Sequence, residues 1–397
     1  MNFFLQKLEM SSVSVRKSSP VVIRPPEPVT SGTTTIKLTS LDSALVKVPF
    51  TALLVFEHPS HDDATETIKS ALSEALAHYS PFAGRIISSR SDDGGDGFSI
   101  RCTGEGMEFV AASADCGLEE AKIFGESTGT ETLLDELAVY YPVGSYGCSG
   151  DDPLLSVQVT EFTCGGLVLG VTWSHAIADG VGIGQFLAAV GELARGSPSP
   201  SVAPARWDAA VSGLPTLFDA IHQATLLCPE PLDLVACVDV TIPSAMISRV
   251  RDKCSNCVAN QLVAAAASGA VASAAIVDLV KMIRRAKDQL PETMVGEEDG
   301  GGGRRLMQGL RGRYNMLHVS SWRNVGFEQV DLGVGAPARV ISHWPGGMPP
   351  VPPICMVYPP CKGKDGVNVL SMSMREEHAD AFLNELANLC RAYRLMD

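Results

Sequence analysis

The chain has 397 residues, of which 45% are hydrophobic and 19% charged, and this composition is typical of a globular protein with two domains. Its net charge of −14 argues against nucleic acid or an anionic membrane as the main partner. The same charge leaves room for a local basic pocket that binds a phosphate-bearing ligand.

Strands and amphipathic helices alternate in the first half. Apolar or alternating runs predict strands over Val21–Ile23, Phe50–Phe56, Glu108–Ala112, Leu154–Phe162 and Leu167–Trp173. Apolar residues at helical spacing predict helices over Ala64–Tyr79 and Ile183–Leu193, and Thr132–Leu137 is a short helix. Turn residues between Ile86–Ser89 and Phe98–Cys102 predict a hairpin. The alternation in Leu154–Phe162 predicts a strand that is buried on one face only.

Ser and Pro are frequent in residues 196–233, which we interpret as a crossover linker. The linker would separate an N-terminal domain, residues 1–195, from a C-terminal domain, residues 234–397. The second domain is predicted to contain strands over Val235–Ile242, His318–Trp322, Phe327–Val330 and Val367–Met374. Its predicted helices are Pro243–Lys253, Val258–Val280 and Arg375–Tyr393.

Eleven scattered cysteines are typical of reduced thiols in a cytoplasmic protein, and we expect a monomer. Cys254 and Cys257 are a lone pair without the further ligands of a zinc site. Residues 1–12 lack the apolar core of a signal peptide. The window Val258–Val280 is long enough for a membrane helix, but its polar residues favour a buried, Ala-rich helix. We therefore expect no membrane partner.

The apolar run Leu167–Trp173 ends at His175, with Asp179 and Gly180 following. An imidazole at a strand end can accept a proton from an alcohol or amine at neutral pH, although a buried structural histidine is the alternative. Asp179 could orient the imidazole or hold the loop. The neighbouring glycines favour a turn here rather than a helix, so that Asp179 would point away from His175 toward a structural arginine. His175 and Asp179 have no third ligand at suitable spacing, so we expect no metal.

Two ordered motifs resemble those of the BAHD acyltransferases, plant enzymes that move an acyl group from coenzyme A to an alcohol or amine. Ser174–Gly180 is similar to their His-x-x-x-Asp-Gly motif, and Val330–Pro337 to their Asp-Phe-Gly-Trp-Gly motif. The resemblance runs nearly end to end. It implies an α/β (α+β layered) fold of two chloramphenicol-acetyltransferase-like domains with a channel between them.

The resemblance also implies roles for single residues. His175 would be the general base that deprotonates a small-molecule acceptor, which attacks the thioester of acyl-CoA directly. No acyl-enzyme and no bound cofactor are expected, because acyl-CoA is a co-substrate. The residues implied to support the site structurally are Asp179, Gly180, Asp331, Gly333 and Gly335. The residues at donor-contact positions are Ser320, Ser321 and Arg323, of which the arginine could bind a phosphate; ordinary strand-end polarity is the alternative.

The sequence departs from the family pattern at two places. Leu332 and Val334 replace the Phe and Trp of the second motif. Lys253 runs almost directly into Asn256–Val258, and the resemblance implies that a segment is missing here, which in the family carries an arginine partner of the aspartate that corresponds to Asp179. A second hypothesis is therefore a catalytically impaired or inactive truncated paralogue that binds a ligand or partner without turnover. A third is a condensation domain of peptide synthesis, which the motif at Asp331 disfavours.

Overall fold

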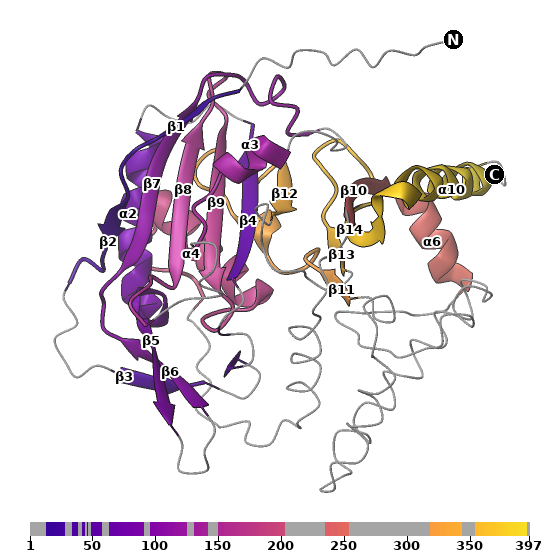
Figure 1. Cartoon of the computed structure of the whole chain (residues 1–397). Helices are drawn as coiled ribbons and strands as arrows, with labels where there is room; N and C mark the ends of the chain where they lie inside the picture. The colour runs from indigo at the N-terminus through magenta and orange to yellow at the C-terminus, as the bar shows by residue number, and fades with distance from the viewer. Residues whose placement is uncertain are drawn as a thin grey trace, which may run out of the picture.

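The structure is a computed structural model. It describes residues 13–27, 34–38, 42–43, 46, 49–57, 63–90, 96–124, 131–141, 150–202, 235–253, 318–343 and 354–394. These residues form a layered α/β arrangement, with a larger sheet in the N-terminal half and a smaller one in the C-terminal half (Figure 1). Among them, no helix is long and apolar enough to cross a bilayer. The predicted Ala-rich helix Val258–Val280 lies outside the described residues.

The larger sheet has seven strands in the described chain, in the order β1-β7-β8-β9-β4-β12, with β2 also paired to β7. The strands are β1 (Val15–Lys17), β2 (Val21–Ile23), β4 (Pro49–Phe56), β7 (Met107–Ala114), β8 (Leu155–Glu161), β9 (Leu167–Ser174) and β12 (Arg339–Ser342). Strand β12 comes from the C-terminal half and pairs antiparallel with β4 (Figure 1). Both halves of the chain therefore contribute to this sheet.

Helices α2 (Ala64–His78) and α4 (Gly180–Ala194) pack together on one face of the larger sheet. Their buried apolar residues recur at helical spacing, as the sequence predicts. They meet Leu155, Val157 and Val159 of β8 in the main core. This core fixes the end of β9 relative to the start of α4, which is where the candidate site lies.

The opposite face of the sheet is also covered. Helix α3 (Glu131–Glu136) lies over it, and residues just after α3 join the second apolar cluster there. Gln158, on this face of β8, is fully buried, and its Nε2 donates to Glu136 O at 2.8 Å. The prediction that β8 is buried on one face only is therefore wrong, because its polar side chains are enclosed as well.

Two smaller sheets complete the described fold. One has the order β3 (Thr34–Lys37), β6 (Asp96–Cys102), β5 (Arg85–Arg90), and it contains the predicted hairpin. The other has the order β10 (Val235–Ile242), β14 (Val367–Arg375), β13 (Ile354–Tyr358), β11 (His318–Ser321). Helices α6 (Ser244–Lys253) and α10 (Glu376–Arg394) lie beside this four-stranded sheet, on the side away from the larger sheet (Figure 1). A short 3-10 helix, η1 (Ser80–Ala83), follows α2.

One predicted strand is wrong. Phe327–Gln329 forms a 3-10 helix, η3, rather than a strand. Gly326 caps it with a φ of 97°, a left-handed conformation that turns the chain sharply before Phe327 is buried. The other predicted strands and helices in the described residues are confirmed within a few residues at their ends. Strands β1, β3, β12 and β13 were not foreseen from the sequence.

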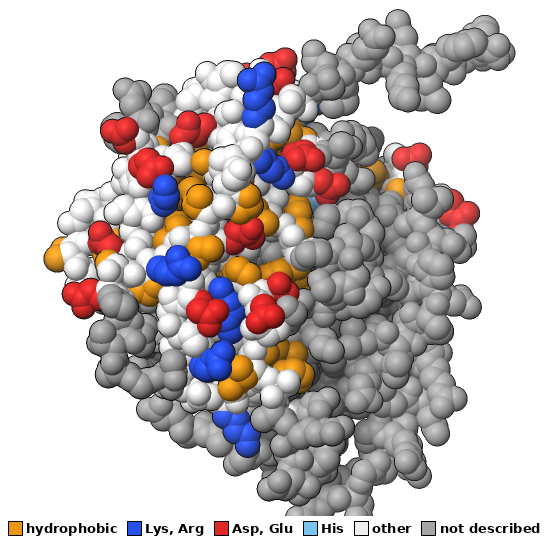
Figure 2. All heavy atoms as spheres, turned by 60° about the vertical axis from the view of Figure 1, so that its left-hand side comes forward, with side chains coloured by type: hydrophobic (Ala, Val, Ile, Leu, Met, Phe, Trp, Pro, Cys, Tyr) orange, Lys and Arg blue, Asp and Glu red, His pale blue; other side chains and the backbone are white. Residues whose placement is uncertain are grey.

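Charge on the surface is mixed. Figure 2 shows acidic and basic side chains interspersed with apolar ones over the described part of the face that it brings forward. Among the described residues on this face, the acidic side chains therefore form no single patch.

Candidate active site

His175 directly follows β9 and begins the short loop that leads into α4. The entry to the loop is fixed because Ser174 N donates to Leu154 O at 2.9 Å. Ser174 then turns the chain: its Oγ accepts from Ala176 N at 3.3 Å, and its carbonyl oxygen accepts from Ile177 N at 3.1 Å. Hydrogen bonds thus hold the backbone on both sides of His175.

The Trp173 side chain braces the far end of the same loop. Its indole Nε1 donates to Ala178 O at 3.0 Å, and the side chain is 1% exposed. A buried indole N–H generally has such a partner, since an unpaired donor in the core is costly. One side chain therefore connects the strand before His175 with the residue that precedes Asp179.

The imidazole of His175 is half-buried, and its Nδ1 is buried without a hydrogen-bond partner in the described part of the chain. Burial lowers the pKa of His175 below its ordinary value of 6.5, while the carboxylates of Asp179 and Asp42 oppose this shift. The net lowering favours the neutral imidazole at neutral pH. Neutral imidazole is the form that a general base requires.

Asp179 caps helix α4. Its Oδ1 accepts from Gly182 N at 2.8 Å, and the helix begins at Gly180. The expectation of a turn through these glycines, with a helix only from Ile183, is therefore wrong. An acidic N-cap stabilises the first turn and so opposes the low helix propensity of these glycines. Within the described residues, no arginine pairs with Asp179.

Glycines on α4 allow a segment of the C-terminal half to approach it closely. A Cβ on Gly184 would stand 2.0 Å from the carbonyl oxygen of Val325, and one on Gly180 would stand 3.2 Å from a methyl of Val325. Further along the helix, a Cβ on Gly191 would stand 2.5 Å from Asp331 O. Residues 325–331 therefore run along α4 from its first turn toward its last.

The motif at Asp331 forms a tight loop. Asp331 Oδ1 accepts from Gly333 N and from Gly335 N, both at 2.9 Å. Both glycines have a positive φ, 91° and 87°, which favours glycine at these positions. Arg195, just after α4, donates to the Asp331 carbonyl oxygen, and its Nη1 lies 3.7 Å from Asp331 Oδ2. The loop is thus attached to the C-terminal end of α4.

The two motifs therefore lie at opposite ends of one helix. Helix α4 has 15 residues, which corresponds to about 22 Å. Asp331 is thus far from His175, and its contacts position the segment that packs on α4. Leu332 and Val334, which replace the aromatic residues of the family motif, are 6% and 8% exposed and belong to the main core.

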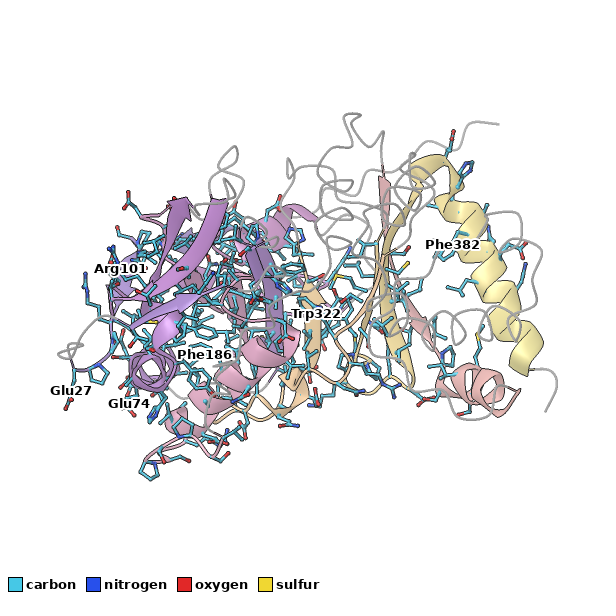
Figure 3. The ribbon with its side chains drawn as sticks, turned by 90° about the horizontal axis from the view of Figure 1, so that it is seen from below. Glu27, Glu74, Arg101, Phe186, Trp322 and Phe382 are labelled. Carbon is cyan, nitrogen blue, oxygen red and sulfur yellow. The ribbon has the colours of Figure 1, made fainter. Side chains whose placement is uncertain are left out.

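The predicted donor-contact residues lie at the His175 end of the helix. Ser320 and Ser321 end strand β11 and are half-buried, and Arg323 is exposed. Between them, Trp322 is 4% exposed, and its backbone N donates to Val357 O at 2.7 Å. Figure 3 shows Trp322 where the two halves of the molecule meet.

Sequence reasoning missed the aromatic residues around His175. The ring centroid of Phe50 lies 5.0 Å from that of the His175 imidazole. Trp173 and Trp322 complete the group, at 6.1 Å and 6.5 Å from Phe50. No local sequence pattern signals this contact, because it follows from the register of β4 against β9, in which Phe50 is opposite Trp173, two residues before His175. Among the residues that the structure describes, no group of three His, Cys, Asp or Glu side chains could hold a metal ion.

Comparison with known proteins identifies similar chains. A sequence profile described as "Transferase family" matches residues 13–223. Acyl transferase 15 of Oryza sativa subsp. japonica is 39% identical over 439 aligned residues, which cover 95% of this chain and 99% of the relative. Because the alignment is longer than this chain of 397 residues, the rice relative has internal residues that this chain lacks. The predicted position of that gap, near Cys254–Cys257, lies outside the described residues.

Solved structures show the same fold. Vinorine synthase aligns with a TM-score of 0.66 at 21% identity and covers 95% of this chain and 98% of its own. F. graminearum TRI101 complexed with ethyl coenzyme A aligns with a TM-score of 0.60 at 14% identity, covering 89% and 97%. The predicted chloramphenicol-acetyltransferase-like α/β fold is thereby confirmed.

Proposed function

Because the chain belongs to the BAHD family of acyltransferases, we propose that it transfers an acyl group from acyl-CoA to an alcohol or amine, with His175 as the general base. The observation that carries this proposal is the setting of His175. Its ring is half-buried at a strand end, its loop is fixed on both sides, and burial lowers its pKa so that it is neutral at neutral pH.

The proposed reaction has two steps. In the first, an acceptor O–H or N–H gives its proton to the imidazole while the acceptor atom bonds to the thioester carbonyl carbon. In the second, the tetrahedral intermediate collapses, the C–S bond breaks, and the thiolate of coenzyme A takes the proton from the imidazolium. The imidazole is regenerated, and no side chain has to become acylated. Because Nδ1 is buried, Nε2 is the nitrogen that takes the proton from the acceptor and later gives it to the thiolate.

The donor is inferred from the C-terminal half. Ser320, Ser321 and Arg323 lie at the same end of α4 as His175, since Val325 packs against Gly180 and Gly184 there. An exposed arginine can bind a phosphate of coenzyme A through charge-assisted hydrogen bonds. TRI101, which shares the fold, is described as complexed with ethyl coenzyme A. We therefore assign these three residues to the acyl-CoA site.

A second candidate is an inactive paralogue that binds a ligand or partner without turnover. The observation in its favour is that this chain is shorter than the alignment with its rice relative. Residues lost from the second domain could remove packing that the donor site needs.

Turnover by the purified full-length chain decides between the two. It would be incubated with acetyl-, benzoyl- and hydroxycinnamoyl-CoA and with a panel of alcohols and amines, and both free thiol and acylated product would be quantified. We expect the two products in equal amounts, dependent on the acceptor, with no acyl-protein adduct by intact mass spectrometry. Failure of every pair to react in a chain that melts cooperatively would support the inactive paralogue.

A further inference from the structure

Among the residues that the structure describes, no carboxylate accepts a hydrogen bond from Nδ1 of the base proposed above. Asp179, four residues along, accepts a hydrogen bond from Gly182 N at 2.8 Å and thereby caps α4. The Nδ1 of His175 has no hydrogen-bond partner within the described residues. Hydrogen bonds fix the backbone on both sides of His175, and within the described residues the imidazole itself has only a weak polar contact with its own backbone. Packing against neighbouring side chains therefore has to contribute to holding the ring.

Phe50 is the aromatic ring that packs against it. The two ring centroids are 5.0 Å apart, with an interplanar angle of 56°. This separation lies within the range in which tilted aromatic pairs attract each other. Phe50 belongs to β4, whose antiparallel register against β9 places it opposite Trp173. The position of Phe50 therefore depends on the sheet and not on the loop that contains His175.

Phe50 is itself held in place by two buried indoles. Its ring lies 6.1 Å from that of Trp173 and 6.5 Å from that of Trp322, and the two indoles lie 6.1 Å apart. Their side chains are 1% and 4% exposed. Because Trp322 belongs to the C-terminal half, this aromatic group also ties the orientation of the base to the docking of the two halves.

We propose that Phe50 is the positioning residue of His175: its ring keeps the imidazole turned with Nδ1 inward, so that Nε2 faces the acceptor. This proposal rests on the role of His175 as general base. Phe50 acts through the imidazole and takes no part in bond making. A misplacement of about 1 Å can lower a catalytic rate by about 100-fold, so a ring of this kind matters for kcat.

The kinetic test uses Phe50→Leu, which keeps an apolar side chain but removes the flat ring, and Phe50→Tyr, which restores the ring. We expect Phe50→Leu to lower kcat by about 10- to 100-fold with little change in KM, and Phe50→Tyr to recover most of the rate. Phe124→Leu is the matched control, because Phe124 is a partly buried ring in the cluster on the other face of the sheet. An unchanged kcat in Phe50→Leu would overturn the proposal.

A double-mutant cycle separates positioning from other roles. In the His175→Ala background, Phe50→Leu should cause no further loss, since nothing remains for Phe50 to orient. A loss of the same size in both backgrounds would overturn the proposal, because Phe50 would then act on the substrate or the fold.

Nuclear magnetic resonance separates this proposal from the proposed function. In the ¹⁵N-histidine-labelled full chain, His175 is the signal that disappears in His175→Ala, among eight histidines. We expect Phe50→Leu to change the tautomer or ring shifts of that signal, and Phe124→Leu to leave them alone. Unchanged shifts in Phe50→Leu would refute the positioning role whatever the activity. Full turnover by His175→Ala would instead refute the proposed role of His175 as the general base. The spectra would still show whether Phe50 orients the His175 ring.

Discussion

Gly191 of helix α4 lies directly against the backbone of Asp331: a Cβ on this glycine would stand 2.5 Å from the Asp331 carbonyl oxygen. Arg195, one turn later, donates to the same oxygen. These contacts connect the last turns of the helix that begins beside His175 with the motif of the C-terminal half. The two motifs are thus coupled through α4 although they do not meet.

This relationship predicts that Gly191→Ala destabilises the protein. The added methyl would overlap a backbone oxygen that cannot move without its loop, and such overpacking costs about 1–3 kcal/mol. Gly182→Ala is the control on the same helix. The added Cβ would have its nearest contact with the Ala178 methyl, at 3.0 Å. The higher helix propensity of alanine should stabilise this variant by about 1 kcal/mol. Equal melting temperatures for the two variants would contradict the assigned packing.

The capping role of Asp179 predicts a difference between two substitutions. Asn can cap a helix as Asp does, whereas Ala cannot, so Asp179→Ala should lower the free energy of unfolding by about 1 kcal/mol more than Asp179→Asn. Urea denaturation measures both. If the two variants are equally destabilised, the carboxylate has a role other than the cap.

The lowered pKa of His175 predicts the pH dependence of the reaction. The neutral imidazole is the base, and burial favours it, so activity should be retained below pH 6.5 and fall only at more acidic values. Asp179→Asn removes a charge that raises this pKa, and should therefore move the acid limb to still lower pH. The profile of kcat/KM against pH tests both statements. An acid limb centred above pH 6.5 is incompatible with them.

The hydrogen bond from Trp173 predicts a loss of folding stability that is specific to this member of the aromatic group. Trp173→Phe keeps a ring but leaves the Ala178 carbonyl without its donor, which should cost about 1–3 kcal/mol and lower kcat. Trp322→Phe is the matched control, since the Trp322 indole makes no hydrogen bond within the described residues. Comparable losses of stability in both variants would show that ring size, and not the hydrogen bond, matters.

Local patterns predicted much of this site. The apolar run of β9, the histidine at its end and the amphipathic face of α4 are all visible in a few consecutive residues. Helix α4 starts earlier than the sequence predicts. Three glycines favour a turn, but the cap from Asp179 and the contact with Val325, which exist only in the folded structure, stabilise the helix there.

Features that depend on distant pairing could not be predicted. Strand β12 is short, and all four of its residues are buried, so it lacks the alternation that reveals a strand. It pairs with β4, almost 300 residues earlier. The contact of Phe50 with His175 likewise follows from the register of β4 on β9, which no short motif records.

The most direct test of the central claim is the rate of acceptor-dependent thiol release by His175→Ala. We predict that kcat falls by about 100- to 10,000-fold, the usual contribution of a general base, while the melting temperature stays close to that of the wild type. A correctly folded His175→Ala protein that releases thiol at the wild-type rate would contradict the assignment of His175 as the base.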